Sequence, residues 1–293
     1  MSVEIVRVGS TRDQLGESPC WDADAQALSW IDALAGTLWR LDPQAMATER
    51  HALPAPVGSI APCSGAAVVV ALRNSFARYD FGTRALTPLA RIDVDHPKVR
   101  FNDGKCDPFG HFLAGTMHMD RQAGEPVLGG LYRLRADGRV EHLADDIGFA
   151  NGPCFSPDGR VLYLADSLER TLWAYDYDPD GPLRNKRLFA KTHEFDSGPD
   201  GATVDSQGFL WTVLTRAAQL ARYAPDGRLD RQIALPASYP SSICFGGPRL
   251  EHLYLTTISR SARLEGALAH DGGLFRIEGL PAAGRLPHVF GGA

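Results

Sequence analysis

The chain has 293 residues, of which 44% are hydrophobic, and its 30 Lys and Arg against 35 Asp and Glu give a formal net charge of −5. This acidic balance, without any run of Lys or Arg, argues against a dedicated nucleic-acid-binding protein. The 30 Gly and 20 Pro favour a turn-rich, all-β protein over a helical one.

The N-terminal segment, residues 1–10, mixes charges into a short apolar stretch and lacks the apolar core of a secretory signal. No apolar run approaches the length of a transmembrane helix, so we expect a cytoplasmic protein without a membrane partner. The cysteines are odd in number and lack Cys-x-x-Cys spacing, which predicts reduced core residues rather than disulfides or a zinc site. They are Cys20, Cys63, Cys106, Cys154 and Cys244.

Short strand-like runs follow one another along the whole chain and are separated by turns rich in Gly, Pro and Asp. The first part of the chain contains the runs 28–32, 37–42, 68–72 and 76–80. The central part contains 111–115, 131–134, 160–164, 172–175, 209–213 and 220–223, and the last part contains 241–244, 252–257 and 273–277. Such runs, punctuated by Asp-Gly pairs, are typical of antiparallel strands joined by tight turns.

Three short segments that begin with an amide or carboxylate side chain recur at intervals of 49 residues, at Asn102, Asn151 and Asp200. Each segment reaches a glycine eight residues later, at Gly110, Gly159 and Gly208. A fixed period of this size indicates a repeat architecture, and the same pattern extends to both sides to make six repeats. Oxygen ligands at one point of successive repeats make a metal site the first hypothesis.

Six repeats of about 45 to 50 residues, each with room for four strands, predict a six-bladed β-propeller that comprises residues 1–293 as one domain. A β-sandwich would explain the strands but not the period. In a propeller the first strand of each blade lines the central channel, so residues that start equivalent strands converge on the axis. We therefore expect Glu17, Asn102 or Asp103, Asn151 and Asp200 to meet there as a central-channel metal site.

Several motifs occur in order along the chain: Leu15-Gly-Glu-Ser-Pro, Arg100-Phe-Asn-Asp-Gly-Lys, Ala114-Gly-Thr-Met, Asn151-Gly-Pro, Pro199-Asp-Gly and Cys244-Phe-Gly-Gly-Pro. Together they resemble the senescence marker protein/gluconolactonase family, which includes regucalcin and bacterial sugar lactonases. The resemblance covers residues 12–278. It implies a six-bladed propeller with one divalent metal at its axis.

By this resemblance Glu17, Asn151 and Asp200 are the metal ligands, and Arg100 and Asn102 contact the substrate. Two carboxylates and an amide oxygen suit Ca²⁺, Mg²⁺ or Mn²⁺, and Zn²⁺ or Fe²⁺ can also occupy such a site. The cation would polarise a lactone carbonyl, and Asp200 is the candidate general base. The implied activity is that of a sugar lactonase, which hydrolyses an aldonolactone of the gluconolactone or pentonolactone type to the aldonic acid.

The chain departs from the family pattern on two loops that are expected to border the pocket. Asp120, which follows His118 and Met119, stands where some relatives place a glutamate that contacts the sugar, so Asp120 is a further substrate-binding candidate. Residues 215–217 read Thr-Arg-Ala where many relatives have Trp-Gly-Gly, and Arg216 could add a cation above the site. The identity of the sugar lactone therefore stays open.

Two other functions remain open on the sequence. One is a metal-binding or protein-binding propeller without catalysis, because a fold does not dictate function. The other is hydrolysis of another class of ester. Catalysis by serine is disfavoured, because the chain has no Gly-x-Ser-x-Gly elbow and Ser59 and Ser167 lack an ordered base. Arg100 and Asn102 beside the ligand set favour the enzyme, since a scaffold needs neither.

Overall fold

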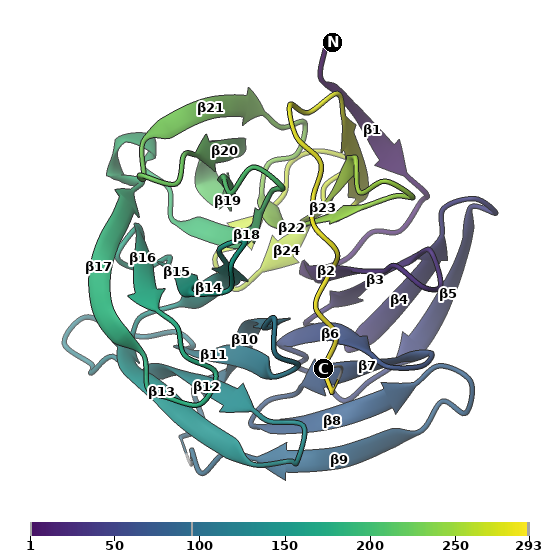
Figure 1. Cartoon of the computed structure of the whole chain (residues 1–293). Helices are drawn as coiled ribbons and strands as arrows, with labels where there is room; N and C mark the ends of the chain where they lie inside the picture. The colour runs from purple at the N-terminus through teal and green to yellow at the C-terminus, as the bar shows by residue number, and fades with distance from the viewer. Residues whose placement is uncertain (1, 95, 292–293) are drawn as a thin grey trace.

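The structure, a computed structural model, describes residues 2–94 and 96–291. Within these residues six antiparallel four-stranded sheets are arranged as blades around a central axis (Figure 1). The predicted all-β, six-bladed propeller is therefore confirmed. No helix in the described part of the chain has the length and hydropathy that crossing a bilayer requires.

In the first five blades, four consecutive strands run from the axis to the rim. Blade 1 contains β2 (Gly16–Asp22), β3 (Ala27–Asp32), β4 (Thr37–Asp42) and β5 (Ala47–Ala52). Blade 2 contains β6 (Ser59–Cys63), β7 (Ala67–Ala71), β8 (Ser75–Asp80) and β9 (Leu86–Arg91). Blade 3 contains β10 (Val99–Cys106), β11 (Phe112–His118), β12 (Gly129–Leu134) and β13 (Val140–Ile147).

Blades 4 and 5 repeat this order, and each is followed or interrupted by a short 3-10 helix. Blade 4 contains β14 (Ala150–Phe155), β15 (Val161–Asp166), β16 (Thr171–Asp176) and β17 (Arg184–Lys191), followed by η1 (His193–Phe195). Blade 5 contains β18 (Pro199–Val204), β19 (Leu210–Leu214), β20 (Gln219–Tyr223) and β21 (Leu229–Ala234), with η2 (Thr215–Ala217) between β19 and β20.

The sixth blade joins the two ends of the chain. It contains β22 (Pro240–Gly246), β23 (His252–Thr257), β26 (Leu274–Glu278) and, as its outermost strand, β1 (Glu4–Val8). A separate hairpin of β24 (Arg260–Ser261) and β25 (Leu264–Glu265) precedes β26. The N-terminal strand therefore closes the ring, a pairing that the repeat pattern did not predict.

The core lies between neighbouring blades, because each sheet packs on both of its faces. β7 reads Ala-Val-Val-Val-Ala, and all five residues are buried. A strand covered on both faces carries a continuous apolar run instead of an alternating one. Between blades 2 and 3, Phe76 packs against Phe101 and Phe112 with ring centroids 4.5 and 5.9 Å apart.

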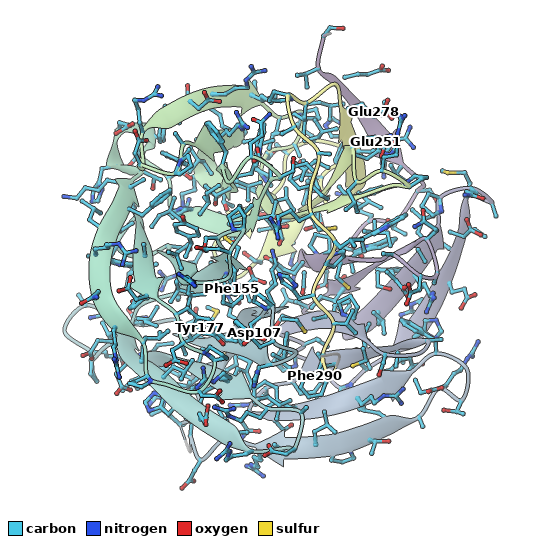
Figure 2. All side chains as sticks on the ribbon, viewed as in Figure 1. Asp107, Phe155, Tyr177, Glu251, Glu278 and Phe290 are labelled. Atoms are coloured by element: carbon cyan, nitrogen blue, oxygen red, sulfur yellow. The ribbon has the colours of Figure 1, made fainter. Side chains whose placement is uncertain are left out.

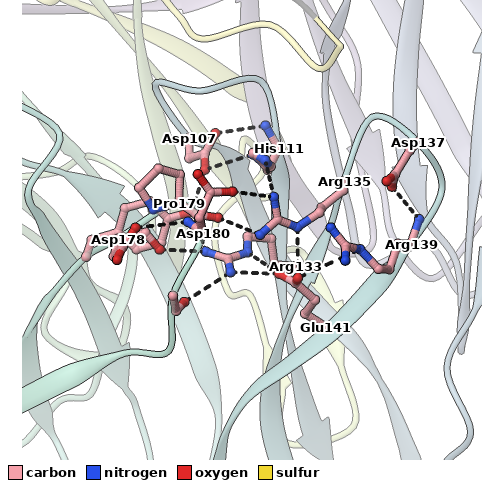
Figure 3. A network of polar contacts seen from close by, with 12 residues as sticks. Asp107, His111, Arg133, Arg135, Asp137, Arg139, Glu141, Asp178, Pro179 and Asp180 are labelled. Carbon is pink, nitrogen blue, oxygen red and sulfur yellow. Dashed lines mark hydrogen bonds and ion pairs between the residues drawn. The ribbon is translucent and has the colours of Figure 1, made fainter.

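A polar network ties blade 3 to blade 4 (Figure 3). The guanidinium of Arg133 on β12 is buried and forms an ion pair with Glu141 at 2.7 Å. It also donates hydrogen bonds to the carbonyl oxygens of Asp178 at 2.9 Å and Gly181 at 3.1 Å, both in the loop between β16 and β17. The buried guanidinium of Arg133 is therefore paired and hydrogen-bonded, and we assign the network to the joining of blades 3 and 4.

The C-terminal segment crosses the end of the channel, as the yellow trace in Figure 1 shows. The backbone N–H of Gly284 donates to the carbonyl oxygen of Leu250, and that of Phe290 donates to the carbonyl oxygen of Pro62, each at 2.8 Å. Phe290 marks the end of this crossing in Figure 2. Beneath the segment lies a cavity of about 100 Å³. Its lining includes four of the five cysteines, all of which are unpaired: Cys20, Cys106, Cys154 and Cys244.

Candidate functional site

The three predicted metal ligands lie at the same place on the inner strands of three blades: Glu17 on β2, Asn151 on β14 and Asp200 on β18. In each strand the pairing with the second strand of the blade shifts by one residue at this place. Such a β-bulge bends the strand and re-aims its side chains. β10, which carries Asn102, has the same shift. Of the two inner strands that supply no predicted site residue, β22 has a register shift and β6 pairs without interruption.

A glycine follows Asn151 and Asp200 because neighbouring inner strands approach closely there. A Cβ atom on Gly152 would lie 2.6 Å from the carbonyl oxygen of Asp200. A Cβ atom on Gly201 would lie 2.2 Å from Oγ of Ser242 in the next blade. These Asx-Gly pairs therefore belong to strands, where the glycines permit the close approach, and not to hairpin turns.

A chain of hydrogen bonds runs from Arg100 across blade 4. Nη1 of Arg100 donates to Oδ1 of Asn102 at 3.1 Å, and Nδ2 of Asn102 donates to Oδ1 of Asn151 at 2.5 Å. Nδ2 of Asn151 donates to Oγ of Ser167 at 2.8 Å. This hydroxyl in turn donates to the carbonyl oxygen of Pro199 at 2.5 Å. Asn102 and Asn151 are thus in contact, as the period predicts, and Arg100 lies beside Asn102.

Asp103 is buried beside this chain, and its carboxylate is engaged by the backbone. Its Oδ2 accepts a hydrogen bond from the N–H of Gly152 at 2.8 Å, and its Oδ1 accepts one from the N–H of Gly104 at 2.9 Å. Asp103 therefore fastens β10 to β14. Nearby, Nζ of Lys105 donates to the carbonyl oxygen of Ala202 at 2.6 Å and links β10 to β18 in the same way.

Asp200 is half-buried, and a hydroxyl fixes its orientation. Oγ1 of Thr215 donates to Oδ2 of Asp200 at 3.0 Å. Burial raises the pKa of Asp200 to about 7, and the carboxylate of Asp103 adds to the increase. Asp200 and Asp103 therefore share one buried, acidic environment.

The carboxyl group of Glu17 is likewise affected by burial and by neighbouring carboxylates. Burial raises its pKa well above the usual range, and the carboxylates of Asp200 and Asp103 raise it further. The guanidinium of Arg100 opposes this effect, while burial lowers the pKa of Arg100 itself to about 10. The three carboxyl groups therefore lie close enough to interact, with Arg100 near Glu17 and Lys105 near Asp103 as opposing positive charges.

The donor set of Glu17, Asn151 and Asp200 fits a hard divalent cation. In the described residues, no three His, Cys, Asp or Glu side chains are arranged as a metal-binding cluster. The predicted ligand set is of another kind, because one of its three ligands is an amide oxygen. Glu17 and Asp200 each have a pKa that burial and a neighbouring carboxylate raise, so a bound cation would favour their ionised forms. Carboxylate and amide oxygens are the ligands that Ca²⁺ and Mg²⁺ prefer.

The structure does not join the rim residues to this site. Asp120 is exposed in the turn after β11, and among the described residues its side chain has no hydrogen bond to the site. His118 is buried, where its Nδ1 donates to the carbonyl oxygen of Pro126 at 3.2 Å and so holds its own loop. Arg216 is exposed, and its backbone N–H donates to Oγ of Ser197. The role of Asp120 in substrate binding stays a prediction.

Two hydroxyl residues contact the predicted ligands, and the sequence patterns did not predict these contacts. Ser167 directly follows β15 and Thr215 directly follows β19, so they occupy equivalent positions in blades 4 and 5. They lie 48 residues apart, close to the period of the ligands themselves. A hydroxyl residue that recurs after the second strand in two of the three ligand-bearing repeats was the available signal.

Comparisons with known proteins show the family to which the chain is similar and bear out the fold. Residues 15–259 match the family model described as the SMP-30/Gluconolactonase/LRE-like region. The chain is 33% identical to regucalcin from Xenopus laevis and 31% identical to regucalcin from Homo sapiens, each over 297 residues and 99% of both chains. Among solved structures, a luciferin-regenerating enzyme has a TM-score of 0.91 at 26% identity and 99% coverage of both chains. A calcium-binding protein, regucalcin, from Agrobacterium tumefaciens has a TM-score of 0.88 at 26% identity, with 97% of this chain and 96% of the other covered.

Proposed function

Because the chain belongs to the SMP-30/gluconolactonase/LRE-like family, we propose that it is a divalent-metal-dependent sugar lactonase. In this proposal it hydrolyses the ring ester of an aldonolactone to the aldonic acid. The observation that supports the proposal is the β-bulge that three inner strands share at Glu17, Asn151 and Asp200, together with the hydrogen-bonded pair of Arg100 and Asn102.

Glu17, Asn151 and Asp200 would hold the cation through their oxygen atoms. When bound, the cation supplies Lewis-acid polarisation of the lactone carbonyl. Thr215 keeps the carboxylate of Asp200 in one orientation, so that one oxygen is engaged at 3.0 Å while the other is available. Which divalent metal the cell supplies does not follow from the ligand types, since several suit oxygen donors.

Arg100 and Asn102 would orient the substrate. Arg100 is buried and holds the carboxamide of Asn102 from one side, while Asn151 holds it from the other. Asn102 itself keeps part of its surface accessible, so it can donate to or accept from sugar hydroxyls without rearrangement. A preorganised polar group of this kind favours the reacting geometry because it is already fixed before the substrate arrives.

Asp200 would act as the general base. A water oxygen attacks the carbonyl carbon of the lactone, and the carboxylate of Asp200 accepts the proton that this water releases. The bond between the carbonyl carbon and the ring oxygen then breaks, and the ring oxygen takes up a proton to become a hydroxyl group. Water is thus added across the ester bond, and no oxidant or second substrate is consumed.

A second function, cation binding without catalysis, is favoured by one observation. The Agrobacterium tumefaciens relative is described as a calcium-binding protein. A site that only binds calcium would need the three oxygen ligands but not the buried Arg100, whose guanidinium opposes cation binding by its charge. We therefore place the lactonase first.

The deciding experiment removes metal with a chelator, reloads the protein with single divalent cations and measures proton release from five- and six-carbon aldonolactones. Hydrolysis above the spontaneous rate that is lost on stripping and restored by one cation is the expected result. Calcium binding by folded protein without hydrolysis of any lactone would instead establish the second function.

A further inference from the structure

Ser167 lies at the end of the hydrogen-bond chain that passes through Asn151. Ser167 directly follows β15 and is half-buried, and its Oγ makes two hydrogen bonds. It accepts from Nδ2 of Asn151 at 2.8 Å and donates to the carbonyl oxygen of Pro199 at 2.5 Å. The proposed mechanism leaves this hydroxyl without a role.

The donor and the acceptor of every hydrogen bond in this series are determined by the groups at its two ends. At one end a guanidinium can only donate, so the atom of Asn102 that faces Arg100 is Oδ1. Nδ2 of Asn102 must therefore face Asn151, which turns Oδ1 of Asn151 toward it. At the other end a backbone carbonyl can only accept, so the proton of Ser167 points to Pro199.

This polarity determines which atom of Asn151 faces Ser167 and which faces Asn102. With its proton directed to Pro199, Oγ of Ser167 offers only a lone pair to Asn151. Only the NH₂ group of the carboxamide satisfies that lone pair, so the oxygen is turned away from Ser167 and toward Asn102. A flipped carboxamide would place two N–H donors where a cation requires an oxygen.

We propose that Ser167 is a positioning residue that holds the carboxamide oxygen of Asn151 toward the cation and thereby sets the affinity for divalent metal. This inference rests on the proposed function, because it assumes that Asn151 is a ligand. Partners that orient metal ligands are worth about 10- to 100-fold in affinity when they are removed. We expect an effect of this size for Ser167.

The test measures binding of metal alone by calorimetry on chelator-stripped, full-length protein. Ca²⁺, Mg²⁺, Mn²⁺ and Zn²⁺ are titrated singly into the wild type, and the cation that binds most tightly is used for the variants. Ser167→Ala is expected to raise the Kd by about 10- to 100-fold. Ser167→Thr keeps a hydroxyl group and is expected to restore binding to within a few-fold of the wild type.

Ser156→Ala is the matched control. Ser156 belongs to the same blade, and its hydroxyl also makes two hydrogen bonds, to Asp158 at 2.6 Å and from the N–H of Val161 at 2.9 Å. It lies in the turn between β14 and β15, at the opposite end of the blade from Asn151. Its removal is expected to leave metal affinity unchanged.

A second set of variants, in an Asn151→Asp background, tests whether Ser167 orients the side chain at position 151 or only stabilises the strand. Asn151→Asp replaces the carboxamide with a carboxylate, whose two terminal atoms are both oxygen, so a flip no longer matters. In this background Ser167→Ala is expected to change the Kd by no more than a few-fold. A loss equal to that in the wild-type background would assign Ser167 to folding of the strand and overturn the inference.

The remaining outcomes distinguish the two proposals. Tight binding by the wild type with an unchanged Kd in Ser167→Ala would overturn the inference and leave the lactonase proposal intact. Binding of none of the four cations by the wild type would overturn the metal site and the inference together.

Discussion

Nδ2 of Asn102 lies 2.5 Å from Oδ1 of Asn151, although 49 residues separate the two along the chain. The contact exists because one repeat of the sequence becomes one blade of the propeller. We expect Asn102→Ala to lower kcat/KM for the preferred lactone by about 10- to 100-fold, the effect of losing 1.5–3 kcal/mol of hydrogen bonding. Metal content, measured by atomic emission, should be retained. Loss of the metal in this variant would make Asn102 a ligand instead.

Asp200→Asn should remove the proposed base while it keeps one oxygen for the cation. Because positioned acid–base groups contribute about 10²- to 10⁴-fold to rate, kcat should fall by a factor in that range. Thr215→Val, which removes only the hydroxyl that orients Asp200, should cost less. Activity of Asp200→Asn within a few-fold of the wild type would rule out its role as base.

A bound cation should stabilise the fold, because it binds the folded protein and not the separated ligands of the unfolded chain. At a free concentration 100 times the Kd, the free energy of unfolding should rise by about 2.7 kcal/mol. The measurement is the Tm with and without a chelator. Glu17→Gln should abolish most of this increase, and an equal increase in the variant would exclude Glu17 from the site.

Asp13 should make stability depend on pH. It is buried, and it accepts hydrogen bonds at 2.8 Å from the indole N–H groups of Trp30 and Trp39. Burial raises its pKa from 3.8 to about 7. Its carboxyl group therefore favours the folded state below pH 4, and this contribution is lost as the pH rises through 7.

The measurement for Asp13 is the free energy of unfolding of the wild type minus that of Asp13→Asn between pH 4 and pH 8. The difference should fall with rising pH by up to about 4 kcal/mol, from about 1.4 kcal/mol for each pKa unit. A difference that stays constant or rises would show that the two indole donors keep the group ionised in the folded protein.

Removal of a buried ion-pair partner should be costly in blade 5. Asp205 is fully buried, and its Oδ2 pairs with the buried guanidinium of Arg222 at 2.7 Å and accepts from Nε1 of Trp211 at 2.9 Å. Asp205→Ala should lower the free energy of unfolding by about 3 kcal/mol, because it removes the fully buried partner of Arg222 and leaves only the partly exposed Asp230 to compensate the charge. Asp226→Ala, in an exposed turn of the same blade, is the control and should cost less than about 1 kcal/mol. Equal costs in urea denaturation would refute this account of the pair.

The sequence was sufficient to predict the six blades, because a 49-residue period and apolar runs at fixed offsets are properties of the chain itself. It also predicted that Asn102 and Asn151 meet, since equivalent positions of repeats face the same axis. The β-bulges at Glu17 and Asp200 could not be predicted, because they depend on how each inner strand pairs with its neighbour.

Side-chain contacts that join different blades also could not be predicted from the sequence. The role of Ser167 depends on a carbonyl of Pro199, 32 residues away on the next blade. The engagement of Asp103 by backbone N–H groups likewise depends on the approach of two strands. The pairing of β1 with β26 had no signal in the period, because residues 4–8 stand outside the first repeat.

The pairing of β1 with β26 has a consequence for the order in which the protein is made. During synthesis β1 leaves the ribosome before the strands of blades 1 to 5, whereas its partner β26, which ends at Glu278, leaves after them. Blades 1 to 5 can form while the chain grows, yet β1 remains an unpaired edge strand until the sixth blade arrives. Ring closure therefore waits until β26 has been made, and nascent chains that stop before β26 carry an exposed strand that can pair with other copies.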